Sequence, residues 1–88
     1  EGVVMGAPDL AVEIISPGSV RRDRVVKKDL YEKFGIAEYW LVDPQNASIE
    51  VYILENEQYQ LHLLADKGDP VSSKLLEGFT FDTGEIFD

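Results

Sequence analysis

The segment Pro8-Asp9-Leu10-Ala11-Val12-Glu13-Ile14-Ile15-Ser16-Pro17 decides the fold, because it places two carboxylates in a run of apolar and β-branched residues. Val12, Ile14 and Ile15 favour a buried strand. Glu13 lies inside that strand, and burying an ionised carboxylate without compensation is costly. Glu13 therefore needs a cation, a hydrogen-bond network or solvent beside it.

The rest of the chain predicts one helix and several strands around this segment. The first strand runs from about Leu10 to Ile15 and ends at a Pro-Gly turn, and the following helix ends at Gly35. Glu38 to Val42 is a second strand, which a helical crossover makes parallel to the first.

The second half of the chain predicts antiparallel pairing. The alternation in 49–54 and 59–63 indicates a hairpin with a turn near Glu55-Asn56-Glu57. Residues 1–88 then form a single α/β (α+β) domain of order β-α-β-β-β, with one main helix on one face of a mixed sheet. The first strand starts so early that we expect a domain lacking N-terminal elements, with its edge exposed.

The helix is predicted to bury an apolar stripe. Val26, Leu30 and Phe34 recur at i, i+4 and i+8, with Val25 beside them. Lys27 adjoins this stripe, on the side shared with Tyr31, and should point toward the first strand, whereas Lys28 faces solvent. Tyr39 and Trp40 belong to the core, and His62 is exposed on the hairpin.

The composition limits which metal ligands and which binding partners are possible for this chain. The chain has no cysteine, so any metal is held by oxygen ligands, and no apolar run is long enough to span a membrane, which favours a cytoplasmic protein. Seventeen acids and eight bases give a net charge of −9, which opposes binding to nucleic acid. Five bases nevertheless lie close together: Arg21, Arg22, Arg24, Lys27 and Lys28.

The spacing of the carboxylates leaves alternatives open. Asp9 and Glu13 share a strand face but lie roughly 13 Å apart at ~3.3 Å per residue, so one ion bridges them only if Asp9 sits on a bend. Otherwise Asp9 caps a turn and Glu13 pairs with a helix base such as Lys27. Lys27 in turn has Asp23 at i−4 as an alternative partner on the helix surface.

A longer ordered series is more specific than any of these spacings. It comprises Pro8-Asp9, Glu13, Ser16-Pro17, Asp23, Lys27, Tyr31, Gly35 and Glu38-Tyr39-Trp40-Leu41-Val42-Asp43-Pro44. Over about residues 6 to 55 this series resembles the Uma-type putative restriction endonuclease family, a branch of the PD-(D/E)XK nuclease superfamily.

The resemblance implies a restriction-endonuclease-like fold in which acids hold Mg²⁺ or Mn²⁺ and a lysine assists attack on DNA. Glu13 matches the acid of the (D/E)XK strand, and Asp9 matches the preceding Pro-Asp. Ile15 stands where the lysine of that motif is expected, and Lys27 on the helix is the matching amine. Tyr31, one turn further along the same helix face, is expected to hydrogen-bond across the site as a supporting residue, and the alternative is that it only packs.

Two hypotheses follow for function. The first is a Mg²⁺-dependent endonuclease domain with Glu13, Lys27 and Asp9 as catalytic residues, Asp9 and Glu13 as metal ligands, and DNA contacts from Arg21, Arg22 and Arg24. The second is a non-catalytic dimeric remnant, or an interaction or regulatory module that retains the fold. We expect the chain alone to self-associate as a homo-oligomer, most simply a dimer, and to cleave DNA poorly or not at all.

Overall fold

The computed structural model describes residues 2–5, 9–16, 18 and 21–87, and the side chains of 9–16, 18, 21 and 24–87. The elements are β1 (Gly2–Met5), β2 (Leu10–Ile14), α1 (Arg21–Lys33), β3 (Glu38–Asp43), β4 (Ser48–Glu55), β5 (Gln58–Asp66), β6 (Pro70–Ser72), β7 (Thr80–Asp82) and the 3₁₀ turn η1 (Thr83–Glu85).

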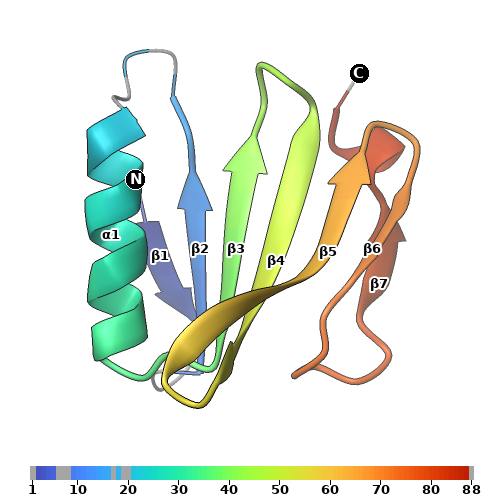
Figure 1. Ribbon diagram of the computed structural model, residues 1–88. Coiled ribbons are helices and arrows are strands. Elements are labelled where there is room, and N and C mark those ends of the chain that lie inside the picture. Colours follow the sequence, from blue (N-terminus) through green and yellow to red (C-terminus); the bar gives the residue numbers. More distant parts are fainter. Residues whose placement is uncertain (1, 6–8, 17, 19–20, 88) are drawn as a thin grey trace.

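Within the described residues, the strands form a five-stranded sheet of order β1-β2-β3-β4-β5 and a separate β6-β7 pair (Figure 1). β2 and β3 are parallel and are joined through α1, and β4 and β5 form an antiparallel hairpin. The predicted mixed sheet with one main helix is therefore confirmed. The helix ends as expected, because Gly35 adopts φ 77° in the left-handed region.

The start of the chain differs from the prediction. β1 pairs with β2 in antiparallel register, with Val3 opposite Val12 and Gly2 opposite Glu13. The expectation that the strand carrying Glu13 has an exposed edge is wrong, because β1 satisfies the hydrogen-bonding groups along it. The edges of the large sheet are β1 and β5.

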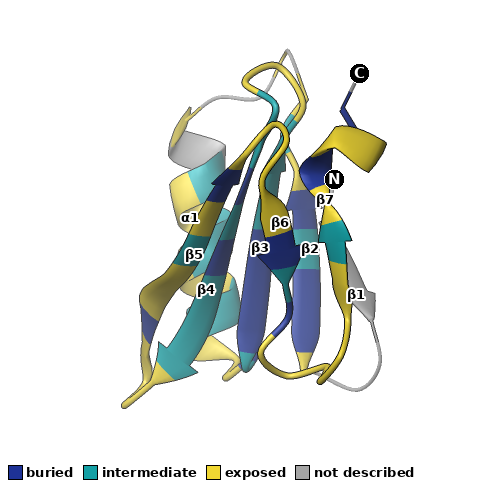
Figure 2. Ribbon diagram, turned by 90° about the vertical axis from the view of Figure 1, so that its right-hand side faces the viewer, coloured by how far each residue is buried: buried dark blue, intermediate teal, exposed yellow. Residues whose placement is uncertain are grey.

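The two faces of the large sheet carry two hydrophobic clusters. The face under α1 holds Ala11, Ile36, Tyr39 and Tyr59. The second cluster lies between the opposite face and the small sheet, and its buried residues are Leu10, Trp40, Ile49, Val51, Ala65, Val71 and Phe87. The inner strands β2 and β3 carry much of the buried surface in Figure 2. Tyr39 and Trp40 belong to the core, as predicted, and lie on opposite faces.

The helix does not bury its apolar stripe, so that prediction is wrong. Val26, Leu30 and Phe34 are 56%, 45% and 68% exposed, and Val25 is exposed as well. The sheet face under α1 carries carboxylates and phenol hydroxyls, and isolating a carboxylate from cations costs more than leaving a few apolar side chains in water. The helix therefore turns basic and aromatic residues inward.

This orientation predicts that the stripe contributes little to folding. Phe34→Ser is expected to change the free energy of unfolding by less than about 0.5 kcal/mol, as for other exposed positions. Ile49→Ala, at a fully buried position, is the matched control and should cost about 2–5 kcal/mol. Urea unfolding of both variants tests this, and a large loss in Phe34→Ser would mean that the stripe is buried.

The hairpin turn and the position of His62 agree with the predictions from sequence. Asn56 and Glu57 have φ 51° and 67°, as a two-residue hairpin turn requires, and His62 is exposed on β5. Among the helices of the described residues, none has the length and apolar character to cross a bilayer.

Candidate active site

Glu13 and Lys27 form an ion pair between β2 and α1. Glu13 is only 4% exposed, on the face of the sheet that α1 covers. The Lys27 Nζ donates to Glu13 Oε2 at 3.0 Å, and the Lys27 side chain is 42% exposed. The predicted proximity of this amine to Glu13 is confirmed. A buried carboxylate held by a half-exposed ammonium is an arrangement that a charged substrate can reach.

Two tyrosines border this pair. Burial first, and then the charge of Glu13, raise the pKa of Tyr31, while Lys27 acts in the opposite direction and a hydrogen bond with Glu13 adds to the rise. Burial and Glu13 likewise raise the pKa of Tyr39. Both phenols therefore remain protonated at neutral pH. Their rings lie 5.5 Å apart between centroids. The hydrogen bond with Glu13 places Tyr31 beside the pair, and its supporting role at the site stays a prediction.

Asp9 lies away from this pair. It occupies the turn before β2 and is exposed, and its backbone carbonyl accepts a hydrogen bond from the Glu38 amide at 2.9 Å. Four strand positions separate it from Glu13, which corresponds to about 13 Å. The described structure does not bring the two carboxylates together as contacting side chains.

The residues of the basic cluster differ in their burial and contacts along α1. Arg21 is exposed and Arg24 is half-buried, whereas the Arg22 side chain lies outside the described residues. The Lys28 Nζ lies 3.9 Å from the ring centroid of Tyr52, a cation–π contact. The prediction that Lys28 faces solvent is wrong, because the aromatic face beneath the helix binds its ammonium.

Sequence reasoning missed Glu38, which is fully buried on the face opposite α1. Its carboxylate accepts from Trp40 Nε1 at 2.5 Å and from the backbone amides of Lys74 and Leu75 at 3.1 and 2.8 Å. The spacing of Glu38 and Trp40 by two strand positions was the available signal, because it places them on one face. Glu38 connects the sheet to the segment before β7.

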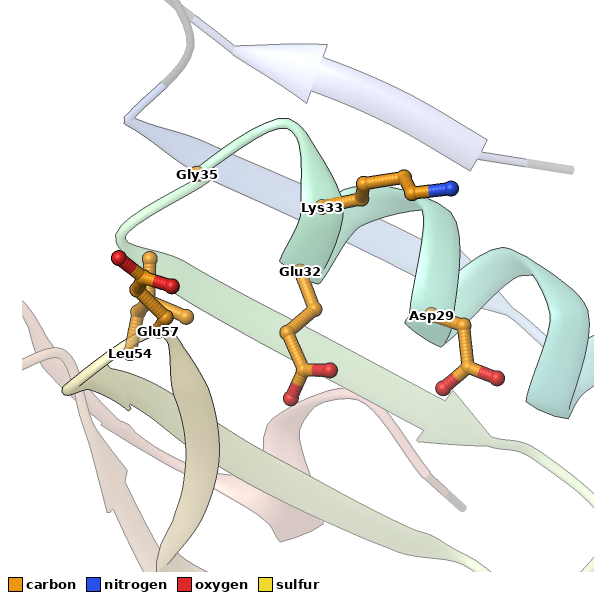
Figure 3. Close-up of a pocket in the computed structure, with 6 residues that line it drawn as sticks. All are labelled: Asp29, Glu32, Lys33, Gly35, Leu54 and Glu57. Carbon is orange, nitrogen blue, oxygen red and sulfur yellow. The ribbon is translucent and has the colours of Figure 1, made fainter.

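A second group of acids lies at the far end of the helix. Asp29, Glu32 and Glu57 line a pocket of about 670 Å³ with Lys33, Gly35 and Leu54 (Figure 3). Glu32 accepts a hydrogen bond from the Tyr59 amide at 2.7 Å. Neither Glu13 nor Lys27 lines this pocket, so it is separate from the candidate active site.

The donor set at Glu13 bears on metal binding. No group of three or more His, Cys, Asp or Glu side chains suited to an ion occurs among the residues described. Glu13 still supplies carboxylate oxygens, the ligand type that Mg²⁺ prefers, and Mg²⁺ sites commonly use one or two carboxylates completed by waters and substrate phosphates. Glu13 is therefore the residue of this pair that offers oxygen ligands to an ion.

Comparison with solved structures shows the fold. The chain matches a crystal structure described as a putative nuclease belonging to DUF820 from Anabaena variabilis, with a TM-score of 0.72 and 22% identity. The match covers 92% of this chain and 44% of that chain, so the present chain spans less than half of its length.

Comparison with protein families extends this result. No curated protein matches the sequence. The family model described as Uma2, putative restriction endonuclease, matches residues 1–84, nearly the whole chain. The resemblance inferred from the ordered residues around Glu13, Lys27 and Trp40 is thereby confirmed. The chain belongs to the Uma2 family of putative restriction endonucleases.

Proposed function

We propose that this chain is the catalytic part of a Mg²⁺-dependent endonuclease that hydrolyses phosphodiester bonds in DNA. The observation that carries the proposal is the Lys27–Glu13 contact of 3.0 Å, which links a buried strand carboxylate to a half-exposed helix ammonium. Family membership and the shared fold support a nuclease-like function. The PD-(D/E)XK arrangement of this pair, with the lysine supplied by the helix, is part of the proposal.

Lys27 and Glu13 have complementary roles in this proposal. The Lys27 ammonium offers positive charge where a phosphoryl group develops negative charge, and preorganised charge of this kind is a major source of rate enhancement. Glu13 holds the ammonium in place and accepts a proton or orients a water through its carboxylate. Tyr31 keeps its proton, because its pKa is raised, and positions the Glu13 carboxylate.

Glu13 is the residue proposed to hold Mg²⁺ or Mn²⁺. Such an ion would supply Lewis-acid stabilisation of charge on the phosphoryl oxygens. Asp9 is proposed as a further acidic residue, acting as a ligand only if the turn before β2 carries it toward Glu13. β1 supplies no acid, since its sequence is Gly-Val-Val-Met. We therefore expect weak metal affinity.

DNA is the proposed substrate, despite the net charge of −9. Arg21, Arg22 and Arg24 belong to the first turn of α1 and are proposed to contact the phosphate backbone. Their local charge acts over a Debye length of about 8–10 Å, within which the acidity of the rest of the chain is partly screened.

The test of this function is nicking of supercoiled plasmid by the purified chain. We expect weak cleavage that requires Mg²⁺ or Mn²⁺ and is lost in EDTA, because one buried carboxylate gives an ion little affinity. Cleavage at the same rate in EDTA would contradict metal dependence. If neither Mg²⁺ nor Mn²⁺ gives cleavage at high enzyme concentration, the proposal that this chain is catalytic is wrong.

A non-catalytic interaction module is the second candidate function. The exposed Val26, Leu30 and Phe34 stripe favours it, because an apolar stripe in water is typical of a surface that binds protein. Self-association through this stripe, as a dimer, is the simplest form of the proposal. Light scattering of the parent and of Phe34→Ser separates this candidate from a monomeric enzyme.

A further inference from the structure

A basic pocket adjoins the candidate active site on the helix-covered face of the sheet. It has a volume of about 240 Å³ and lies between α1, β3 and β4. Its lining residues are Arg21, Arg24, Val25, Lys28, Tyr39, Leu41, Glu50 and Tyr52. Three cations and one carboxylate leave an excess of positive charge, in a chain whose net charge is −9.

Two buried hydrogen-bonding atoms belong to residues that line this pocket. The Tyr39 hydroxyl is buried in a residue that is 0% exposed, and the Arg24 Nε is buried as well. Neither atom has a hydrogen-bond partner in the described part of the chain. A buried donor without an acceptor costs about 1–3 kcal/mol, so both atoms favour an acceptor from outside the chain.

Three other polar lining residues, Tyr52, Glu50 and Lys28, already have partners. The Tyr52 hydroxyl is hydrogen-bonded to Glu50, and Lys28 lies over the Tyr52 ring. Glu50 is therefore turned toward Tyr52, and it is the one lining group that repels an anion. The Arg24 Nε and the Tyr39 hydroxyl are the two buried donors of the lining residues that lack an acceptor in the described part of the chain.

We propose that this pocket binds a phosphate group, through the Arg24 Nε and the Tyr39 hydroxyl, with Arg21 and Lys28 supplying charge. An arginine and a neutral phenol are suitable donors for phosphate oxygens. The phosphate belongs either to a DNA backbone, which rests on the proposed function, or to a free phosphate anion, which does not.

The primary test is titration of the chain with inorganic phosphate at constant ionic strength, followed by the Nε–Hε NMR signal of Arg24. This signal should shift with phosphate and not with chloride. Tyr39→Phe should weaken phosphate binding about tenfold, the loss of one charge-assisted hydrogen bond. An Arg24 signal that does not move, or a Tyr39→Phe variant that binds phosphate as tightly as the parent, would overturn the proposal.

Tyr59→Phe is the matched control, because Tyr59 stacks on Tyr39 at 5.6 Å and its hydroxyl donates to the Ile36 carbonyl at 2.7 Å. Without phosphate, Tyr39→Phe should melt at the same temperature as the parent or higher, since it removes a buried hydroxyl without a partner. Tyr59→Phe should melt lower and keep its phosphate affinity. Equal lowering of both melting temperatures would indicate that the Tyr39 hydroxyl has a protein partner, against the proposal.

A second titration with a short duplex DNA in EDTA separates the two sources of phosphate. A shift of the Arg24 signal at DNA concentrations well below those needed with inorganic phosphate assigns the pocket to a backbone phosphate. A shift with inorganic phosphate alone assigns it to a free anion. Because EDTA prevents metal-dependent cleavage, this result is independent of nuclease activity.

Discussion

Replacing Lys27 by glutamine is expected to lower the rate of DNA cleavage at least about a hundredfold. Removing a single preorganised group that stabilises developing charge typically costs a factor of about 10²–10³. Lys27 contacts Glu13 directly, at 3.0 Å, and glutamine keeps its approximate length without its charge. Plasmid nicking at saturating Mn²⁺, with parent and variant at equal concentration, measures the change.

Controls separate this chemical effect from folding. Lys33→Gln removes an exposed lysine of the same helix and should leave cleavage within about twofold, since surface substitutions rarely exceed about 0.5 kcal/mol. Lys27→Arg keeps the charge and should recover part of the rate.

Glu13→Gln should be inactive at all ion concentrations. If Lys27→Gln cleaves DNA normally while Glu13→Gln does not, Lys27 is only the ion-pair partner of Glu13. Melting temperatures of all variants are needed, because the pair also contributes to folding, although solvent around the half-exposed Lys27 limits that contribution.

The strand around Glu13 and its lysine partner were predictable from sequence for a physical reason. A carboxylate among β-branched residues must have a partner, and a helix that follows a parallel strand returns across the same face of the sheet. The contact between Glu13 and Lys27 follows from these two constraints.

The orientation of the helix was not predictable from its own periodicity. Val26, Leu30 and Phe34 have the spacing of a buried stripe, yet they lie outward. What decides the orientation is the sheet beneath, where Glu13 and the tyrosines of β3 to β5 favour Lys27 and Lys28 at the interface. A periodicity argument treats the partner surface as apolar, and here that surface is polar.

The short N-terminal strand was missed for a related reason. Four residues of Gly-Val-Val-Met carry too little periodicity to be distinguished from a loop. Antiparallel pairing with β2, which places Gly2 opposite Glu13 and Met5 opposite Leu10, is what makes this segment a strand. The metal ligands were not predictable either, because no sequence pattern fixes the direction of the turn that holds Asp9.

Glu38→Ala is expected to cause the largest loss of stability of any substitution considered, about 3–5 kcal/mol, comparable to breaking a buried charged network. Glu38 is fully buried and accepts three hydrogen bonds, from the Trp40 indole and two backbone amides. Alanine removes the two carboxylate oxygens that accept these three hydrogen bonds, and it leaves a cavity. Because total stability is about 5–15 kcal/mol for such domains, urea unfolding should show a strongly lowered midpoint.

Glu77→Ala is the matched control, since Glu77 is an exposed glutamate of the same C-terminal segment, and it should change stability by less than about 0.5 kcal/mol. Glu38→Gln should lie between the two, because its amide keeps one acceptor oxygen but turns a donor toward other donors. Hydrogen exchange should show the earliest loss of protection at Lys74 and Leu75, whose amides lose their acceptor. Equal stability of Glu38→Ala and Glu77→Ala would mean that the C-terminal segment is held by its apolar contacts alone, and that Glu38 needs another explanation.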